Sequence, residues 1–135
     1  MAIQYSTTVR NAQLDALETA IGTAAVLKIR TGAAPANVGT ADSGTVLASM
    51  TLPSDWLAAA SGGSKAKSGT WQDASADATG TAAHFRIYAS DGTTAHIQGT
   101  VTATGGGGDL TLDNTSIASG QSVTISSFTL TAANS

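Results

Sequence analysis

The sequence predicts a mainly β protein: an antiparallel β-sandwich or jelly-roll-like domain with one N-terminal α-helix. Two observations carry this prediction. After residue 23 the chain divides into about seven or eight short segments of alternating apolar and polar residues, separated by turn-forming residues. Ala, Thr, Gly and Ser supply 77 of the 135 residues (26, 21, 15 and 15), and threonine favours strands while glycine and serine favour turns. A chain of this length is expected to form one domain over residues 1–135.

An amphipathic helix is predicted over residues 8–21. Two leucines and an isoleucine recur at i, i+3 and i+7 in its second half, and three alanines widen the apolar stripe. Thr7 or Thr8 can serve as the N-cap, and Gly22 stands where a left-handed C-cap residue belongs. The apolar stripe is expected to lie on one end or face of the sheets that follow.

Two strands are predicted next, over residues 25–30 and 45–52, because apolar and polar residues alternate in both. The segment between them, 32–44, is rich in Gly, Pro, Asn and Asp and is expected to be turn-like. Pro53 ends the second strand, since it lacks the N–H that continued pairing needs. A single helical turn is predicted over residues 55–59.

A loop rich in small residues is predicted over residues 61–68, where no apolar side chain provides an anchor. Lys65 and Lys67 lie within it and are interpreted as solvated loop residues. A short strand is then expected at Thr70–Gln72, followed by an acidic loop over residues 73–78.

The clearest strand pair is predicted over residues 81–89 and 94–102. A three-residue loop, Asp91–Thr93, brings the apolar residues of the two strands onto one face, with Ile87 opposite Ile97. Under this register the inward set is Phe85, Ile87, Ile97 and Val101, and the outward set is His84, Arg86, Tyr88, His96 and Gln98.

The last third of the chain is expected to hold two more strands. Four glycines at 105–108 form a flexible turn before a brief strand at Leu110–Leu112. A final strand is predicted over residues 121–131, and its apolar residues change phase at Ser126–Ser127. Such a phase change within one apolar run predicts a β-bulge.

Charge and composition argue against several classes of function. The net charge of −3 and the pI near 4.9 give no electrostatic reason to bind nucleic acid or an anionic membrane. The chain has no cysteine, so a disulfide framework and a thiolate metal site are excluded. The N-terminal residues lack the charged and apolar regions of a signal peptide, so the chain is expected to be made in a cytoplasm.

Two histidines are the first candidates for chemistry. His84 and His96 share the outward face of the predicted hairpin, displaced diagonally from each other. A metal site needs a third ligand and acid–base catalysis needs a positioned partner, and neither predicted strand contains Asp or Glu. Histidines at the surface or in an interface are the preferred interpretation.

Acidic residues provide a second set of candidates. Asp109 and Asp113 flank a predicted strand, with Asn114 beside them, but their spacing matches no EF-hand loop. Carboxylates at strand ends commonly serve turns, and the same interpretation applies to Asp73 and Asp77. No metal site is assigned to either pair.

The remaining candidates are structural. The glycine run precedes neither a Lys-Ser/Thr pair nor a helix, and no serine lies in a Gly-x-Ser-x-Gly motif. Glu18 is the only glutamate and cannot form a two-glutamate pair. Trp71 is expected in the core, whereas Trp56 can be a core residue or an interface residue. No catalytic, cofactor-binding or metal-binding residue is predicted, and the chain is expected not to be an enzyme.

Several segments together resemble small structural proteins of tailed bacteriophages and prophages. They are residues 8–17 (TVRNAQLDAL), 27–32 (LKIRTG), 53–56 (PSDW), 69–72 (GTWQ), 84–88 (HFRIY) and 105–116. The resemblance implies a virion component. Among such proteins, a small β-sandwich without catalytic groups is most similar to a capsid decoration (cement) protein, which binds the outer surface of the shell as a dimer or trimer.

This resemblance implies that the major capsid protein and copies of the chain itself are its partners, at the capsid surface of the virion. The polar residues before the helix, 1–7, are interpreted as an N-terminal arm that is ordered on a neighbour. Three alternatives stay open: a tail, neck, fibre or receptor-binding component of the virion, a carbohydrate-binding module, and an enzyme, which is the weakest because no clustered nucleophile, base and acid is visible in the sequence. A carbohydrate-binding module usually exposes aromatic residues on one face, and in the predicted hairpin only Tyr88 qualifies.

Overall fold

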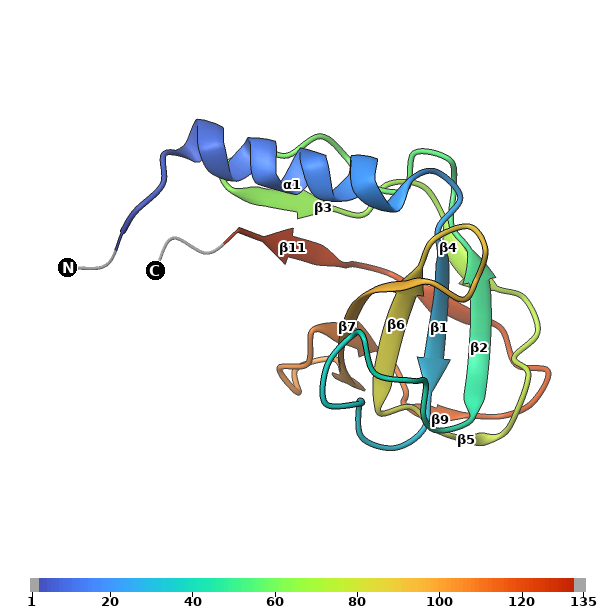
Figure 1. The fold of residues 1–135 in the computed structure, drawn as a ribbon. Coiled ribbons are helices and arrows are strands. Elements are labelled where there is room, and N and C mark those ends of the chain that lie inside the picture. Colours follow the sequence, from blue (N-terminus) through green and yellow to red (C-terminus); the bar gives the residue numbers. More distant parts are fainter. Residues whose placement is uncertain (1–2, 133–135) are drawn as a thin grey trace.

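The computed structural model describes residues 3–132, which form one helix and eleven short strands (Figure 1). The helix is α1 (Thr7–Ile21). The strands are β1 (Val26–Arg30), β2 (Val46–Thr51), β3 (Ser64–Ala66), β4 (Trp71–Asp73), β5 (Gly80–Thr81), β6 (His84–Tyr88), β7 (Ala95–Ala103), β8 (Leu110–Leu112), β9 (Ser116–Ile117), β10 (Val123–Ile125) and β11 (Thr129–Thr131).

Five strands form the main sheet, in the order β2-β1-β6-β7-β8. Its neighbouring strands are antiparallel except β7 and β8, which run parallel. The remaining strands of the described residues form antiparallel pairs: β10 with β4, β11 with β3, and β5 with β9. The prediction of a mainly β protein with one N-terminal helix is therefore confirmed.

The helix begins one residue earlier than predicted. Ser6 is the N-cap, because its Oγ accepts a hydrogen bond from the Val9 N–H at 3.2 Å. The choice of Thr7 or Thr8 was wrong because three consecutive hydroxyl residues can all fill this role and the pattern does not separate them. The predicted C-terminus is confirmed: Gly22 follows the helix at φ +91°, and its N–H bonds back to the last turn.

The predicted register of the central hairpin is confirmed over most of its length. Phe85 lies opposite Gly99 and Ile87 opposite Ile97. The register then shifts by one residue, so that Tyr88 pairs with Ala95. This bulge near the turn replaces the uniform three-residue loop that alternation alone predicted.

Two local predictions before residue 70 are wrong. Residues 55–59 form no helical turn; Leu57 instead makes an isolated bridge to Lys67. The predicted loop at 61–68 contains β3, which pairs with β11. A strand of three residues is too short for alternation to reveal it.

The strand predicted over residues 121–131 is two strands. β10 pairs with β4, whereas β11 pairs with β3. The phase change at Ser126–Ser127 is therefore a break at which the chain leaves one strand pair for another, and no β-bulge joins the two parts.

A row of aromatic side chains runs through the core. Trp56, Trp71, Phe128 and Phe85 follow one another with ring centroids 6.0, 5.4 and 5.6 Å apart. Both tryptophans are fully buried, so Trp71 is a core residue as predicted and Trp56 is one too. These rings fill space that the many alanines cannot fill.

Candidate functional site

The helix α1 and the ribbon of β3 and β11 form an extension that projects from the body of the protein (Figure 1). Backbone groups before β3 fix the helix in place. Arg10 donates from Nη2 to the Gly62 carbonyl at 3.1 Å, and the Gly63 N–H donates to Asn11 Oδ1 at 2.8 Å. The N-terminal half of the helix is therefore held against the segment that leads into the ribbon.

Lys65 of β3 fastens the ribbon to the helix. Its Nζ lies 2.7 Å from Asp15 Oδ1 and 3.0 Å from Glu18 Oε1, and its side chain is 2% exposed. Burial lowers the pKa of Lys65, but the hydrogen bonds to Asp15 and Glu18 outweigh this, so its pKa is raised. The hydrogen bond from Lys65 also lowers the pKa of Asp15. The interpretation of Lys65 as a solvated loop residue is therefore wrong.

The end of the extension that lies farthest from the body carries exposed apolar side chains. Ile3, Tyr5 and Val9 are 75%, 46% and 43% exposed, and they are the large apolar residues of the described chain that are exposed. They lie in the segment before α1 and in the first turn of the helix. Exposed large apolar residues near one another in sequence at one end of a molecule are candidates for a protein-binding surface.

A groove of about 500 Å³ lies between the ribbon and the main sheet. Apolar side chains from both sides line it, together with polar groups of β7 and of the segment before β8. The lining residues are Phe85, Ile97, Gln98, Gly108, Asp109, Phe128, Thr129, Leu130 and Thr131.

The outward face of the predicted hairpin is covered. The segment between β1 and β2, residues 31–45, lies over β6, and its Asp42 bonds to three side chains from the main sheet. Asp42 Oδ1 accepts from Arg86 Nη1 and from Tyr88 Oη, both at 2.8 Å, and Asp42 Oδ2 accepts from Arg30 Nη2 at 3.0 Å. His84, Arg86 and Tyr88 are consequently buried, although they lie on the face that was predicted to point outward.

Gln98 hydrogen-bonds both to Arg86 and to the covering segment. Its Oε1 accepts from Arg86 Nε and Nη2 at 3.1 and 2.9 Å, and its Nε2 donates to the Pro35 carbonyl at 2.9 Å. Burial raises the pKa of Asp42, but the hydrogen bond from Tyr88 and the charges of Arg30 and Arg86 together lower it. The cluster is an internal ion network that holds residues 31–45 on the sheet.

The two histidines do not form a shared site. His84 Nδ1 lies 2.7 Å from the Gly32 carbonyl, and its Nε2 is buried without a hydrogen-bond partner among the described residues. His96 is exposed. Within residues 3–132, no group of three His, Cys, Asp or Glu side chains is placed to hold a metal ion.

Two of the acidic candidates, Asp73 and Asp109, accept hydrogen bonds from backbone N–H groups, and one of these bonds, from Ser75 to Asp73, lies within a turn. Asp73 Oδ2 accepts from the Ser49 N–H at 2.9 Å and its Oδ1 from the Ser75 N–H at 3.0 Å. Asp109 Oδ2 accepts from the Thr100 N–H at 2.9 Å.

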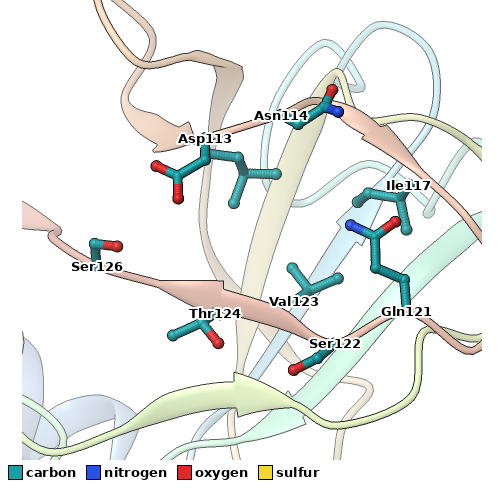
Figure 2. Close-up of a pocket in the computed structure, with 9 residues that line it drawn as sticks. Asp113, Asn114, Ile117, Gln121, Ser122, Val123, Thr124 and Ser126 are labelled. Carbon is teal, nitrogen blue, oxygen red and sulfur yellow. The ribbon is translucent and has the colours of Figure 1, made fainter.

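Asp113 borders a shallow hollow of about 250 Å³ (Figure 2). Its other polar groups come from Asn114, Gln121, Ser122, Thr124 and Ser126, and its apolar lining comes from Leu112, Ile117 and Val123. Asn114 uses its Oδ1 to accept from the Ser116 N–H at 2.9 Å. Amide and hydroxyl groups around one carboxylate can hydrogen-bond a polar surface, but this arrangement points to no particular ligand.

Comparisons with protein-family models, with curated proteins and with solved structures gave no match to this chain. Among residues 3–132, no helix is both long and apolar enough to span a membrane. The arguments for function therefore rest on the residues and their geometry.

Proposed function

We propose that the chain is a structural protein of a tailed-phage virion, a capsid decoration protein that binds the outer shell and stabilises the contacts between capsomers. The segments that resemble phage structural proteins support the virion assignment. The proposal includes a sandwich-like body, in which the β4–β10 pair packs across the core from the main sheet, and two kinds of partner: the major capsid protein and copies of this chain.

The observation that carries an assembly role is how charged and apolar side chains are distributed. Every cation of the chain donates a hydrogen bond or forms an ion pair within the fold, so the cations stabilise the folded chain. Apolar side chains, by contrast, gather at the exposed end of the extension. The cations are Arg10, Lys28, Arg30, Lys65, Lys67 and Arg86.

A cement role also agrees with the shape of the molecule. The extension reaches away from the body (Figure 1), so one copy can contact a neighbour while its body contacts the shell. The short strand pairs leave strand edges that can accept a strand from another chain. Surface buried across capsomers would oppose the outward pressure of packaged DNA.

The test is made on purified virions of the phage that encodes the chain. We expect mass spectrometry to find the chain in the particles, and antibody labelling to place it on the head. Particles that lack the chain should be less resistant than wild-type particles to heat and to low salt. Adding the purified chain to these particles should restore their resistance. Labelling on the tail would favour the tail or fibre alternative, and particles that lack the chain would overturn the proposal.

A further inference from the structure

The ribbon presents an unpaired strand edge to the groove. The Lys67 N–H donates to the Phe128 carbonyl at 2.8 Å, and the Ala132 N–H donates to the Gly63 carbonyl at 3.0 Å. Residues 128, 130 and 132 therefore direct their backbone groups toward β3. Because these directions alternate along a strand, the N–H and C=O groups of Thr129 and Thr131 point to the opposite edge. Among the described residues, no strand pairs with that edge.

β7 borders the same groove with a second open edge. The Thr100 N–H points away from β6, since it donates to Asp109 Oδ2 at 2.9 Å. By the same alternation the backbone groups of Gln98 point in that direction. β8 pairs with β7 only at residues 101–103, so in the described structure no strand covers the β7 edge beside Gln98.

The segment before α1 has the pattern of a strand that would fit such a groove. Ile3-Gln4-Tyr5-Ser6 alternates apolar and polar residues, and Ser6 has extended backbone angles, φ −63° and ψ 158°. Of the predicted N-terminal arm, residues 1 and 2 lie outside the described residues and Thr7 belongs to α1, so from here on residues 3–6 are called the arm. The arm leaves the helix at the end farthest from the body, so its own apolar side chains lie outside the groove (Figure 1).

We propose that the arm of a second copy of this chain binds in the groove as an added β-strand. Its backbone would pair with the open edge of β11 or of β7, and Ile3 and Tyr5 would pack against the apolar lining. The arm of a second copy carries no acidic residue, and the nearest charge after it is Arg10. The groove carries one carboxylate, Asp109, so the two surfaces meet without repulsion although each copy has a net charge of −3.

This inference rests on the proposed function in one respect, because that function names copies of the chain as partners. Its test uses purified protein alone, so it can fail while the virion assignment holds, and the reverse is equally true. If two copies each place their arm in the other's groove, they form a closed dimer. If each copy places its arm in the groove of the next copy, the copies form a ring. The assembled mass distinguishes these two forms of the same contact.

The absence of cysteine makes disulfide trapping the direct experiment. Tyr5→Cys and Thr131→Cys are purified separately, one of them labelled with ¹⁵N, then mixed and oxidised. We expect a disulfide-linked pair that contains one labelled and one unlabelled chain. The matched control replaces Thr131→Cys with Thr124→Cys, an exposed threonine of β10 outside the groove, and should give much less of the mixed pair.

Two outcomes of the trapping experiment would overturn the inference. The first is equal trapping at positions 131 and 124. The second is a disulfide within one chain when Tyr5→Cys and Thr131→Cys are combined and oxidised at high dilution, since the chain's own arm would then occupy the groove. Sedimentation gives an independent measurement: the wild type should associate, and Ile3→Ser/Tyr5→Ser should weaken this at least tenfold while tryptophan fluorescence stays unchanged. A monomeric wild type would also contradict the proposal.

Discussion

Replacing Asp42 with asparagine removes the carboxylate that pairs with two buried arginines. The Arg86 side chain is 2% exposed and that of Arg30 is 9% exposed, and both guanidinium groups bond to Asp42 at 2.8 and 3.0 Å. The amide keeps the shape of the carboxylate but not its charge, and one of its two atoms would present N–H groups to a donor. We therefore expect Asp42→Asn to loosen residues 31–45 and to lower the free energy of unfolding.

The expected size follows from the burial of the partners. Removing one member of a buried ion pair costs about 3–5 kcal/mol, because the other charge is left uncompensated in the interior. The Asp42 side chain is 36% exposed, so water can partly replace it. We therefore expect Asp42→Asn to lower the free energy of unfolding by about 3 kcal/mol. This is a large part of the total free energy of unfolding of a typical protein, which is about 5–15 kcal/mol. The corresponding fall in Tm is roughly 10 °C for a chain of this size.

The effect should depend on pH in one direction. The folded state holds the pKa of Asp42 below its ordinary value of 3.8. Its stabilisation is therefore fully present above pH 3.8 and is lost as the pH falls through the lower folded-state pKa. The difference in stability between wild type and Asp42→Asn should be constant at neutral pH and should shrink below 3.8.

Urea unfolding followed by tryptophan fluorescence measures these differences, because Trp56 and Trp71 are buried in the fold and exposed on unfolding. The matched control is Asp113→Asn, which removes the same charge from an exposed residue at the rim of the hollow. Surface changes of this kind usually stay within about 0.5 kcal/mol. If Asp42→Asn costs no more than the control, or if the difference grows at low pH, the ion network does not hold residues 31–45.

Two further substitutions test how the fold is held together. Gly44→Ala should destabilise far more than Gly32→Ala. Both glycines have positive φ (+76° and +77°), but a Cβ at Gly44 would overlap the Thr31 carbonyl oxygen, whereas one at Gly32 would meet nothing within 4 Å. Equal losses of stability in urea unfolding would refute this explanation. Lys65→Met should release α1 from the ribbon, whereas Lys67→Met, which removes a more exposed lysine nearby, should not. Limited proteolysis within α1 measures this, and equal cleavage of the two variants would contradict it. Because the pKa of Lys65 is raised, its contribution should persist below pH 10.5 and be lost as the pH rises further.

The parts of the fold that sequence predicted are those with a sustained local pattern. The stripe of α1 and the alternation of β6 and β7 fixed the type of each element. For β6 and β7 the apolar residues also fixed which residues face each other, because a slip of one residue would turn the apolar set outward. The observed pairs Phe85–Gly99 and Ile87–Ile97 belong to the one register that puts the apolar residues of both strands on the same face of the sheet.

The parts that sequence missed depend on partners far along the chain. Lys65 is buried because two carboxylates 50 and 47 residues earlier surround its Nζ, and nothing beside Lys65 in sequence indicates them. Residues 32–44 contain no apolar run, so they were interpreted as a turn-like segment. What places them over β6 is one carboxylate, Asp42, together with polar contacts to Gln98. Single polar contacts of this kind leave no periodic signal.

The residues that stabilise the fold differ from those that we propose for assembly. Two outlying parts of the molecule are fastened by buried cations. Lys65 ties α1 to β3, and Arg30 and Arg86 tie residues 31–45 to the main sheet. Charge thus stabilises the inside of the molecule, whereas the exposed large apolar residues Ile3 and Tyr5 lie outside it on the arm. Substitutions in the ion networks should therefore change stability, and substitutions in the arm should change association at unchanged stability. A variant of the arm that unfolds the body as readily as Asp42→Asn would show that the two sets of residues are not separate.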